Sequence, residues 1–103
     1  MEAFAALADP TRRRIVELLA NGERSAGDLA RRFTLTQPAV SQHLRALRDA
    51  RLVRARPDAQ RRMYSIDPRG LAKIDAWLSR YRAFWTTRLD ALERALQSED
   101  KGK

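Results

Sequence analysis

The chain has 103 residues, which fits one domain, and it contains no cysteine. The lack of thiols excludes disulfides, thiolate metal sites and thiol redox sensing by this chain. Its formal net charge of +8 and pI of about 11.2 favour a polyanionic partner, either nucleic acid or anionic lipid. No apolar run approaches the ~20 residues of a membrane span. The N-terminus lacks the basic and apolar regions of a secretory signal, so we expect a cytoplasmic protein.

The positive charge is concentrated in one third of the chain. Residues 31–62 contain nine arginines and two aspartates, a local charge of +7. A solvated charged face is the simpler interpretation of a basic segment. A segment this unbalanced favours contact with nucleic acid instead.

Two helices are predicted in the first twenty residues. A short apolar helix is expected over residues 2–8. Asp9 is then the expected cap of a second helix over residues 11–20. Pro10 directly after it supports this start, because proline is favoured at the first helical position. The pair Asn-Gly at 21–22 ends this helix.

A helix-turn-helix is predicted next. Ser25 and Asp28 form a variant of the capping box, which begins a helix over residues 26–33. After a tight turn, Thr36 caps a second helix over residues 37–50. A short helix, a turn and a second amphipathic helix make this motif.

The second of these helices has one apolar face and one polar face. Val40, Leu44 and Leu47 recur at the spacing of a buried stripe. The opposite face and its shoulder carry slim, amide or cationic side chains, which can approach a major groove and read base edges: Gln37, Pro38, Ser41, Gln42 and Arg45. Thr36 and the N-terminus of the helix can hold a phosphate. An ordinary amphipathic surface helix is the alternative.

A hairpin is expected directly after this helix, with strands over residues 52–56 and 62–66 and a turn over 57–60. Such a hairpin forms a wing, which lies along the DNA backbone or minor groove. The candidate backbone contacts are its four arginines and the helix cap: Arg54, Arg56, Arg61, Arg62 and Thr36. A long helix is expected from residue 68 to about residue 96.

The long last helix carries a nearly continuous apolar stripe, which is the pattern of a helix pair. The short first helix cannot cover it, so the expected partner is a second copy of the chain in a two-fold dimer. The predicted interface residues are Phe4, Leu7, Trp77, Leu78, Tyr81, Trp85, Leu89 and Leu92. Packing of the stripe on its own domain is the alternative. A dimer places two recognition helices about one DNA turn apart and predicts an inverted-repeat operator.

The predicted fold is therefore mainly α with a two-stranded β wing, in the order α-α-α-α-β-β-α. It is a homodimeric winged helix-turn-helix. One domain is expected over residues 1–97, followed by a frayed tail over 98–103.

With these elements placed, the chain resembles the ArsR/SmtB family of bacterial winged-helix repressors. The matching stretches are LADPTRRRIVELL, SAGDLARRF, TQPAVSQHLRALRDARLVRAR and RRMYSID. The resemblance covers residues 3–67, and the long last helix fits as well. It implies that Gln37, Pro38, Ser41 and Gln42 face the major groove. It also implies a homodimer that represses operons, often its own, at inverted repeats and releases DNA when an effector binds.

Two departures from the family concern its metal sites. The cysteines of thiolate-type sensors are missing. The Asp-x-His motif of zinc-type sensors is also missing, because Asp75 is followed by Ala76 and Trp77. The only histidine, His43, stands in the recognition helix. We therefore expect no metal site and no cofactor.

The last helix resembles a cysteine-free branch of the family. This likeness suggests either an apolar small-molecule effector or none. Tyr81, Phe84 and Trp85 would line an effector pocket, although a place in the dimer core is the simpler role for them.

The expected function is a sequence-specific transcriptional regulator that binds double-stranded DNA as a dimer. The alternatives are a non-specific architectural DNA-binding protein and a helix-mediated protein interaction module. An enzyme is not expected, because the chain has neither a Gly-rich phosphate loop nor a paired-carboxylate motif.

Overall fold

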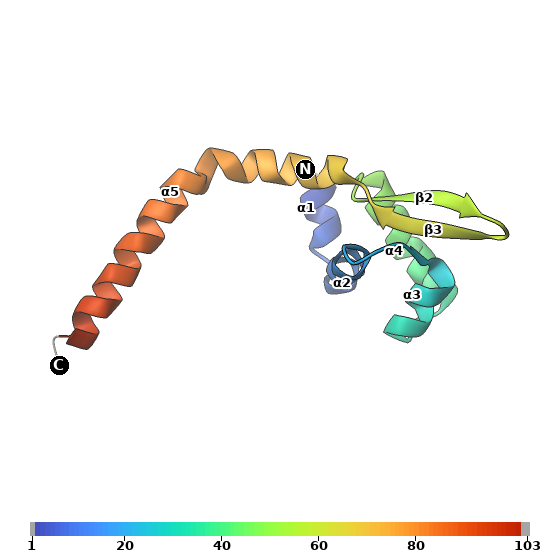
Figure 1. The fold of residues 1–103 in the computed structure, drawn as a ribbon, viewed down its shortest axis with the longest axis horizontal. Coiled ribbons are helices and arrows are strands. Elements are labelled where there is room, and N and C mark those ends of the chain that lie inside the picture. The colour runs from blue at the N-terminus through green and yellow to red at the C-terminus, as the bar shows by residue number, and fades with distance from the viewer. Residues whose placement is uncertain (1, 102–103) are drawn as a thin grey trace.

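The structure is a computed structural model, and it describes the backbone of residues 2–101 and the side chains of residues 2–99. Its elements are α1 (Glu2–Leu7), α2 (Pro10–Leu19), β1 (Arg24–Ser25), α3 (Ala26–Phe33), α4 (Gln37–Asp49), β2 (Val53–Asp58), β3 (Arg61–Ile66) and α5 (Pro68–Lys101). Helices α1–α4 and the sheet form a body. The hairpin projects from one end of this body, and most of α5 projects from the other (Figure 1).

The predicted helix caps are confirmed at the starts of α2, α3 and α4. In each case a side-chain oxygen accepts a hydrogen bond from a backbone N–H three residues later: Asp9 from Arg12 at 3.0 Å, Ser25 from Asp28 at 3.1 Å and Thr36 from Ala39 at 3.2 Å. Each cap contributes about 1 kcal/mol. These local interactions explain why the helices begin nearly where the sequence predicts.

The two helices of the helix-turn-helix end in the same way, with a left-handed residue. Thr34 follows α3 with φ of 54°, and Arg51 follows α4 with φ of 59°. After α3 the Leu35 N–H donates to the Ala30 carbonyl at 3.0 Å; after α4 the Leu52 N–H donates to the Leu47 carbonyl at 2.9 Å. This is the Schellman arrangement, which normally places glycine at the left-handed position. A β-branched residue such as Thr34 is strained there.

The sheet has three antiparallel strands in the order β1-β3-β2. The prediction of two strands was therefore incomplete, because Arg24 and Ser25 pair with Tyr64 and Met63. Two residues are too short to show an alternating pattern, and Ser25 is at the same time the cap of α3. The predicted hairpin is confirmed.

The hairpin turn is shorter than predicted. Pro57 and Asp58 belong to β2, where they pair with Arg62 and Arg61. Proline is tolerated there because β2 is an edge strand and needs no N–H on its open side. The turn itself is residues 59–60, and its first residue has φ of 56°.

The core lies between the helices and the inner face of the sheet. Its largest fully buried side chains are Ile15, Leu29, Val40, Leu44, Leu47, Leu52 and Val53. They include the stripe predicted on α4, whose polar face therefore points away from the body. Among the described residues, Asp67 is the one charged residue that is buried.

Helix α5 is longer than predicted. The sequence suggested an end near residue 96 and a frayed tail from residue 98, but α5 runs to Lys101, and residues 102–103 lie outside the described part. The helix bends along its length (Figure 1). The Ser79 hydroxyl donates to the Asp75 carbonyl at 2.8 Å, a contact that tends to bend helices. Within the described residues, no helix is both long and apolar enough to cross a membrane.

Candidate nucleic-acid interface

The outer face of α4 presents the side chains that the sequence singled out for base reading. Gln37, Pro38, Ser41, Gln42 and Arg45 are all exposed, while the stripe on the other side of the helix is buried. None of the five takes part in an ion pair within the described chain. Their amide, hydroxyl and guanidinium groups are therefore available to another molecule.

The Gln37 side chain, at the start of α4, reaches the first turn of α3. Its side-chain amide nitrogen would lie 3.6 Å from a Cβ atom added at Gly27. Thr36 is exposed, and its Oγ1 accepts the Ala39 N–H. Its hydroxyl hydrogen can still be donated to an anion, as a backbone phosphate contact requires.

His43 occupies a different environment from the residues predicted to read bases. It is half-buried, and its Nδ1 atom is buried without a hydrogen-bond partner in the described structure. No group of three metal-ligating side chains comes together among the described residues. Asp75, at the position where zinc sensors begin their motif, receives a hydrogen bond from Arg82 at 3.0 Å.

The four wing arginines do not share one face of the hairpin. Successive strand residues point to opposite faces, and the register pairs Arg62 with Pro57. Arg54, Arg56 and Arg61 therefore lie on one face, and Arg62 lies on the other. The sequence predicted these residues as one group, but the pleat divides them.

Carboxylates already hold two of these arginines. Arg56 donates from Nε and Nη2 to the two carboxylate oxygens of Glu23, both at 2.8 Å. This hydrogen bonding lowers the pKa of Glu23 and raises that of Arg56. Arg61 lies 3.5 Å from a carboxylate oxygen of Asp58. In the described part of the chain, Arg54 and Arg62 have no such partner.

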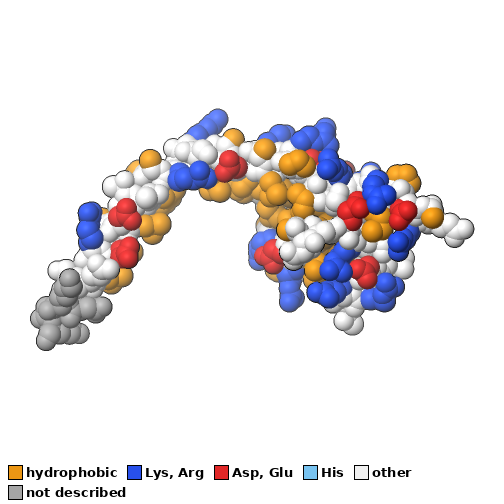
Figure 2. Space-filling view, in the orientation of Figure 1, with side chains coloured by type: hydrophobic (Ala, Val, Ile, Leu, Met, Phe, Trp, Pro, Cys, Tyr) orange, Lys and Arg blue, Asp and Glu red, His pale blue; other side chains and the backbone are white. Residues whose placement is uncertain are grey.

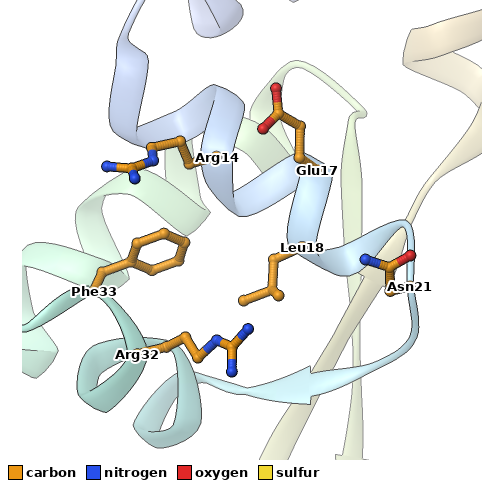
Figure 3. Close-up of a pocket in the computed structure, with 6 residues that line it drawn as sticks. All are labelled: Arg14, Glu17, Leu18, Asn21, Arg32 and Phe33. Atoms are coloured by element: carbon orange, nitrogen blue, oxygen red, sulfur yellow. The ribbon is translucent and has the colours of Figure 1, made fainter.

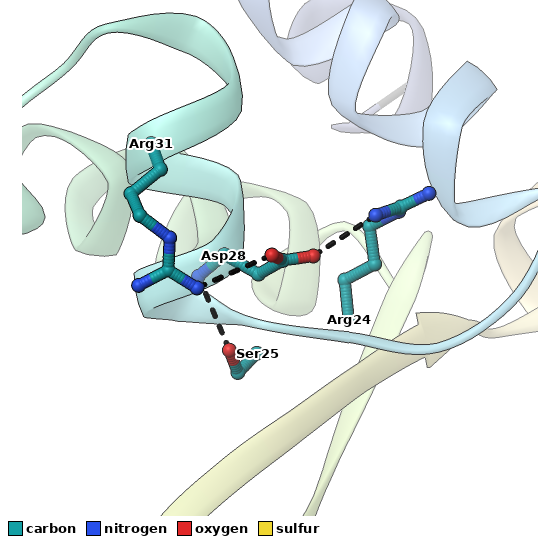
Figure 4. A network of polar contacts seen from close by, with 4 residues as sticks. All are labelled: Arg24, Ser25, Asp28 and Arg31. Atoms are coloured by element: carbon teal, nitrogen blue, oxygen red, sulfur yellow. Dashed lines mark hydrogen bonds and ion pairs between the residues drawn. The ribbon is translucent and has the colours of Figure 1, made fainter.

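A second group of ion pairs surrounds the start of α3 (Figure 4). Asp28 accepts hydrogen bonds from Arg24 at 2.9 Å and from Arg31 at 3.3 Å. The hydrogen bond from Arg24, followed by that from Arg31, lowers the pKa of Asp28 against the opposing effect of burial. The capping box is thus only half formed. The Ser25 hydroxyl accepts the Asp28 N–H, but in the described structure the Asp28 carboxylate binds arginines and does not return a bond to the Ser25 N–H.

A hollow of about 460 Å³ lies between α2 and α3 (Figure 3). Leu18 and Phe33 point into it, and Arg14 and Arg32 line it from the two helices. Neither arginine forms an ion pair in the described structure. Glu17 also lines the hollow and opposes their charge, so the site has no strong preference for anions.

Hydrophobic side chains cover a continuous band on α1 and α5 (Figure 2). Phe4 packs edge-on against Trp77, with ring centroids 5.3 Å apart, and Trp77 contacts Tyr81 at 5.0 Å. Along α5 the side chains of the predicted interface are exposed: Trp77, Leu78, Tyr81, Trp85, Leu89 and Leu92. Leu7 differs, because it is half-buried against the core of its own chain.

Phe84 and Trp85 also pack edge-on, with ring centroids 5.3 Å apart, and the Arg88 guanidinium lies 4.1 Å from the centroid of Phe84. Phe84 and Arg88 line an open hollow on the helix surface. These aromatic side chains are exposed in the single chain. An enclosed pocket at this position would need a second molecule to complete it.

Sequence reasoning missed the acidic partners of the interface. Glu23 lies 33 positions from Arg56, so no local spacing marks that pair. Asp28 lies four residues after Arg24 and three before Arg31, and this spacing could have predicted both of its ion pairs. Arg61 and Arg62 are adjacent in the predicted hairpin, and this could have shown that the wing arginines divide between two faces.

Comparison with known proteins agrees with this geometry. Residues 9–55 match the family model described as "Bacterial regulatory protein, arsR family". The chain is 50% identical to the HTH-type transcriptional regulator Rv2034 of Mycobacterium tuberculosis over 97 residues, 94% of this chain and 88% of that protein. It is 36% identical to the transcriptional repressor SdpR of Bacillus subtilis, over 73% of this chain and 83% of that one.

Two solved structures have the same fold. A possible transcriptional regulator for arsenical resistance superposes with a TM-score of 0.73 at 42% identity, covering 89% of this chain and 93% of that chain. The homodimeric winged helix-turn-helix DNA-binding domain of Mb0332 from Mycobacterium bovis gives a TM-score of 0.66 at 30% identity, covering 80% and 76%. The chain belongs to the ArsR family of bacterial transcriptional regulators.

Proposed function

We propose that the chain is a homodimeric repressor that reads an inverted-repeat operator with the exposed face of α4. The observation that carries this proposal is the separation of the two faces of α4: the stripe is buried, and the amide, hydroxyl and guanidinium groups opposite it are exposed. Membership of a family of DNA-binding regulators supports it. A bacterial regulator of this kind acts where the chromosome is, in the cytoplasm.

The roles of the side chains follow from their chemistry. Glutamine can form two hydrogen bonds with adenine, arginine can do so with guanine, and serine pairs with several bases. We assign base reading to Gln37, Ser41, Gln42 and Arg45, with Pro38 packing against the groove. Thr36 and the wing arginines are assigned to the backbone. Arg54 and Arg62 are the strongest candidates in the wing, because no carboxylate occupies them.

Dimerisation through α1 and α5 explains the exposed apolar band. Side chains of this size gain about 1.5–3 kcal/mol each when fully buried, so a long stripe left in water is unfavourable. A solved relative at 30% identity is described as homodimeric, and repression is supported by the relative named as a repressor. We also propose that an apolar effector, if the regulator has one, binds near Tyr81, Phe84 and Trp85 within the dimer.

The experiment that tests sequence reading is fluorescence anisotropy on DNA from upstream of the protein's own gene, with shuffled DNA of equal length as the competitor. We expect a preference of about a hundredfold or more at physiological salt. The variant Ser41→Ala with Gln42→Ala should lose most of this preference and keep its affinity for shuffled DNA.

The matched control is Gln97→Ala with Ser98→Ala, which removes the same two groups from the exposed surface of α5. This control should behave as the wild type. Retained discrimination in the α4 variant would contradict its assignment as the reading helix. Equal binding of the wild type to both DNAs would point to an architectural role, or to an operator elsewhere that in vitro selection would reveal.

A further inference from the structure

The first turn of α5 is joined to the residues that end the recognition helix. Arg51 and Leu52 close α4, and their two carbonyl groups accept hydrogen bonds from this turn. The Gly70 N–H donates to the Arg51 carbonyl at 2.8 Å, and the Asp67 N–H donates to the Leu52 carbonyl at 3.0 Å. The end of the reading helix and the start of the dimer helix are thus linked through backbone atoms.

Gly70 makes this close approach possible. A Cβ atom at this position would lie 2.5 Å from the Arg51 carbonyl oxygen and 2.9 Å from that of Ala50. Both are backbone atoms, so no flexible side chain could move aside. The glycine lies within helix α5 and is not among the residues with positive φ. It is therefore needed for the contact and not for an unusual backbone conformation.

Asp67 holds the same turn by its side chain. Its carboxylate is buried and accepts the Arg69 N–H at 3.0 Å. The Arg69 guanidinium adds hydrogen bonds to both carboxylate oxygens, the shortest at 2.7 Å. The turn that donates to the end of α4 is therefore itself fixed.

By contrast, the other link from α5 to the body is made by side chains. One part of it runs through α1, where Phe4 meets Trp77 and both rings are partly exposed, and another part is Ile74, which packs against the core. A contact between partly exposed rings can shift more easily than a contact held by two backbone hydrogen bonds. The joint at Gly70 is thus the contact that most directly sets the angle between α5 and α4.

We propose that Gly70 and Asp67 are positioning residues for DNA recognition, which fix the angle between the dimer helix and the recognition helix and so set the spacing of the two half-sites. This inference rests on the proposed function, since it requires a dimer on an inverted repeat. The reading residues Ser41 and Gln42 lie nine to ten residues from the joint, about 15 Å along α4. A rotation of about 10° there would move them by about 2.6 Å, and DNA rises by about 3.4 Å per base pair.

Because both protomers carry the same joint, such a rotation in each would change the separation of the reading residues by up to about 5 Å, which is about one to two base pairs. The half-site sequence should not change, because the reading side chains stay in place on α4. Spacing and half-site sequence are therefore separate readouts. A residue that merely stabilised the fold would change neither of them in the folded protein.

The test is in vitro selection of DNA from a random duplex library with the wild type, Gly70→Ala and Asp67→Asn. The control is Asp90→Asn, the same chemical change as Asp67→Asn at an exposed carboxylate of α5 that forms no ion pair in the described structure. We expect the wild type and the control to select one spacer length. Gly70→Ala should select the same half-sites with a shifted or broader range of spacers. Its preference for the wild-type operator over a single half-site should fall about tenfold.

Asp67→Asn keeps the number of heavy atoms and weakens the bonds from Arg69, so it loosens the joint without a steric clash and should broaden the range of spacers around the wild-type length. This variant decides the question if circular dichroism shows that Gly70→Ala does not fold. An unchanged spacer and an unchanged preference in the folded variants would overturn the positioning role. Failure of the wild type to select any inverted repeat would overturn the proposed function itself, and this inference with it.

Discussion

Asp67 should make the stability of the fold depend on pH in the acid range. Hydrogen bonds from the Arg69 guanidinium and backbone, against the opposing effect of burial, lower the pKa of this carboxyl from 3.8 to about 2. The unfolded chain therefore takes up a proton at a higher pH than the folded chain does. The stabilisation is fully present above about pH 4 and is lost as the pH falls through about 2.

The size of the effect follows from the shift in pKa. A difference between 3.8 and about 2 corresponds to about 2 kcal/mol of unfolding free energy. The Arg69 side chain is 62% exposed, although that of Asp67 is only 3% exposed. Solvent screens the exposed partner, so we expect about 1 kcal/mol in practice.

The assay is urea unfolding of the wild type and Asp67→Asn at pH 6, 4, 3 and 2, at one protein concentration because a dimer's stability depends on it. Other carboxyls, such as Glu23 and Asp28, also have lowered pKa values. The informative quantity is therefore the difference between the two proteins. It should be largest at pH 6 and should shrink as the pH approaches 2. A difference that stays constant over this range would refute the assignment of the ion pair as its cause.

Three further predictions concern the wing, the turn and the dimer helix. Glu23→Gln should release Arg56 to bind a phosphate, so that affinity for random duplex DNA rises and the slope of log K against log salt steepens by about one. Adding Arg56→Ala to this variant should restore the original slope, and a slope that stays steep would exclude Arg56 as the cause. Thr34→Gly should raise the free energy of thermal unfolding by about 0.5–1 kcal/mol, because it relieves the left-handed strain; a loss of stability would mean that the threonine side chain contributes more than its strain costs. Trp85→Ala with Leu89→Ala should raise the dimer dissociation constant about a hundredfold or more in sedimentation while leaving the folded body intact; an unchanged constant would place the interface elsewhere.

The sequence was most informative where local chemistry decides the structure. A cap is a side chain three residues from its partner, as at Asp9, Ser25 and Thr36, so spacing alone locates it. The buried stripe of α4 repeats with the helical period, and it identifies the opposite face as exposed. These two local rules were sufficient to locate the helix-turn-helix and to select the exposed residues of α4 that we propose read bases.

Interactions between distant residues could not be predicted in the same way. Strand β1 is only two residues long, and it exists because β3 offers it an open edge. The pair of Glu23 with Arg56 joins residues 33 positions apart, and no periodic pattern marks it. The contact of Gly70 with Arg51 likewise appears only when the hairpin has brought α5 back to the end of α4.

These distant contacts change what the basic charge of the chain means. Arg12 and Arg13 donate to carbonyl groups at the end of α1, at 2.7 Å and 3.0 Å, where they hold a helix in place. Six further arginines form ion pairs with carboxylates: Arg24, Arg31, Arg56, Arg61, Arg69 and Arg82. Many of the positively charged side chains therefore bind groups of their own chain, and a net charge of +8 overstates the number of phosphate contacts. The salt dependence of binding should reflect the smaller set of arginines that the protein leaves unpaired near α4 and the wing.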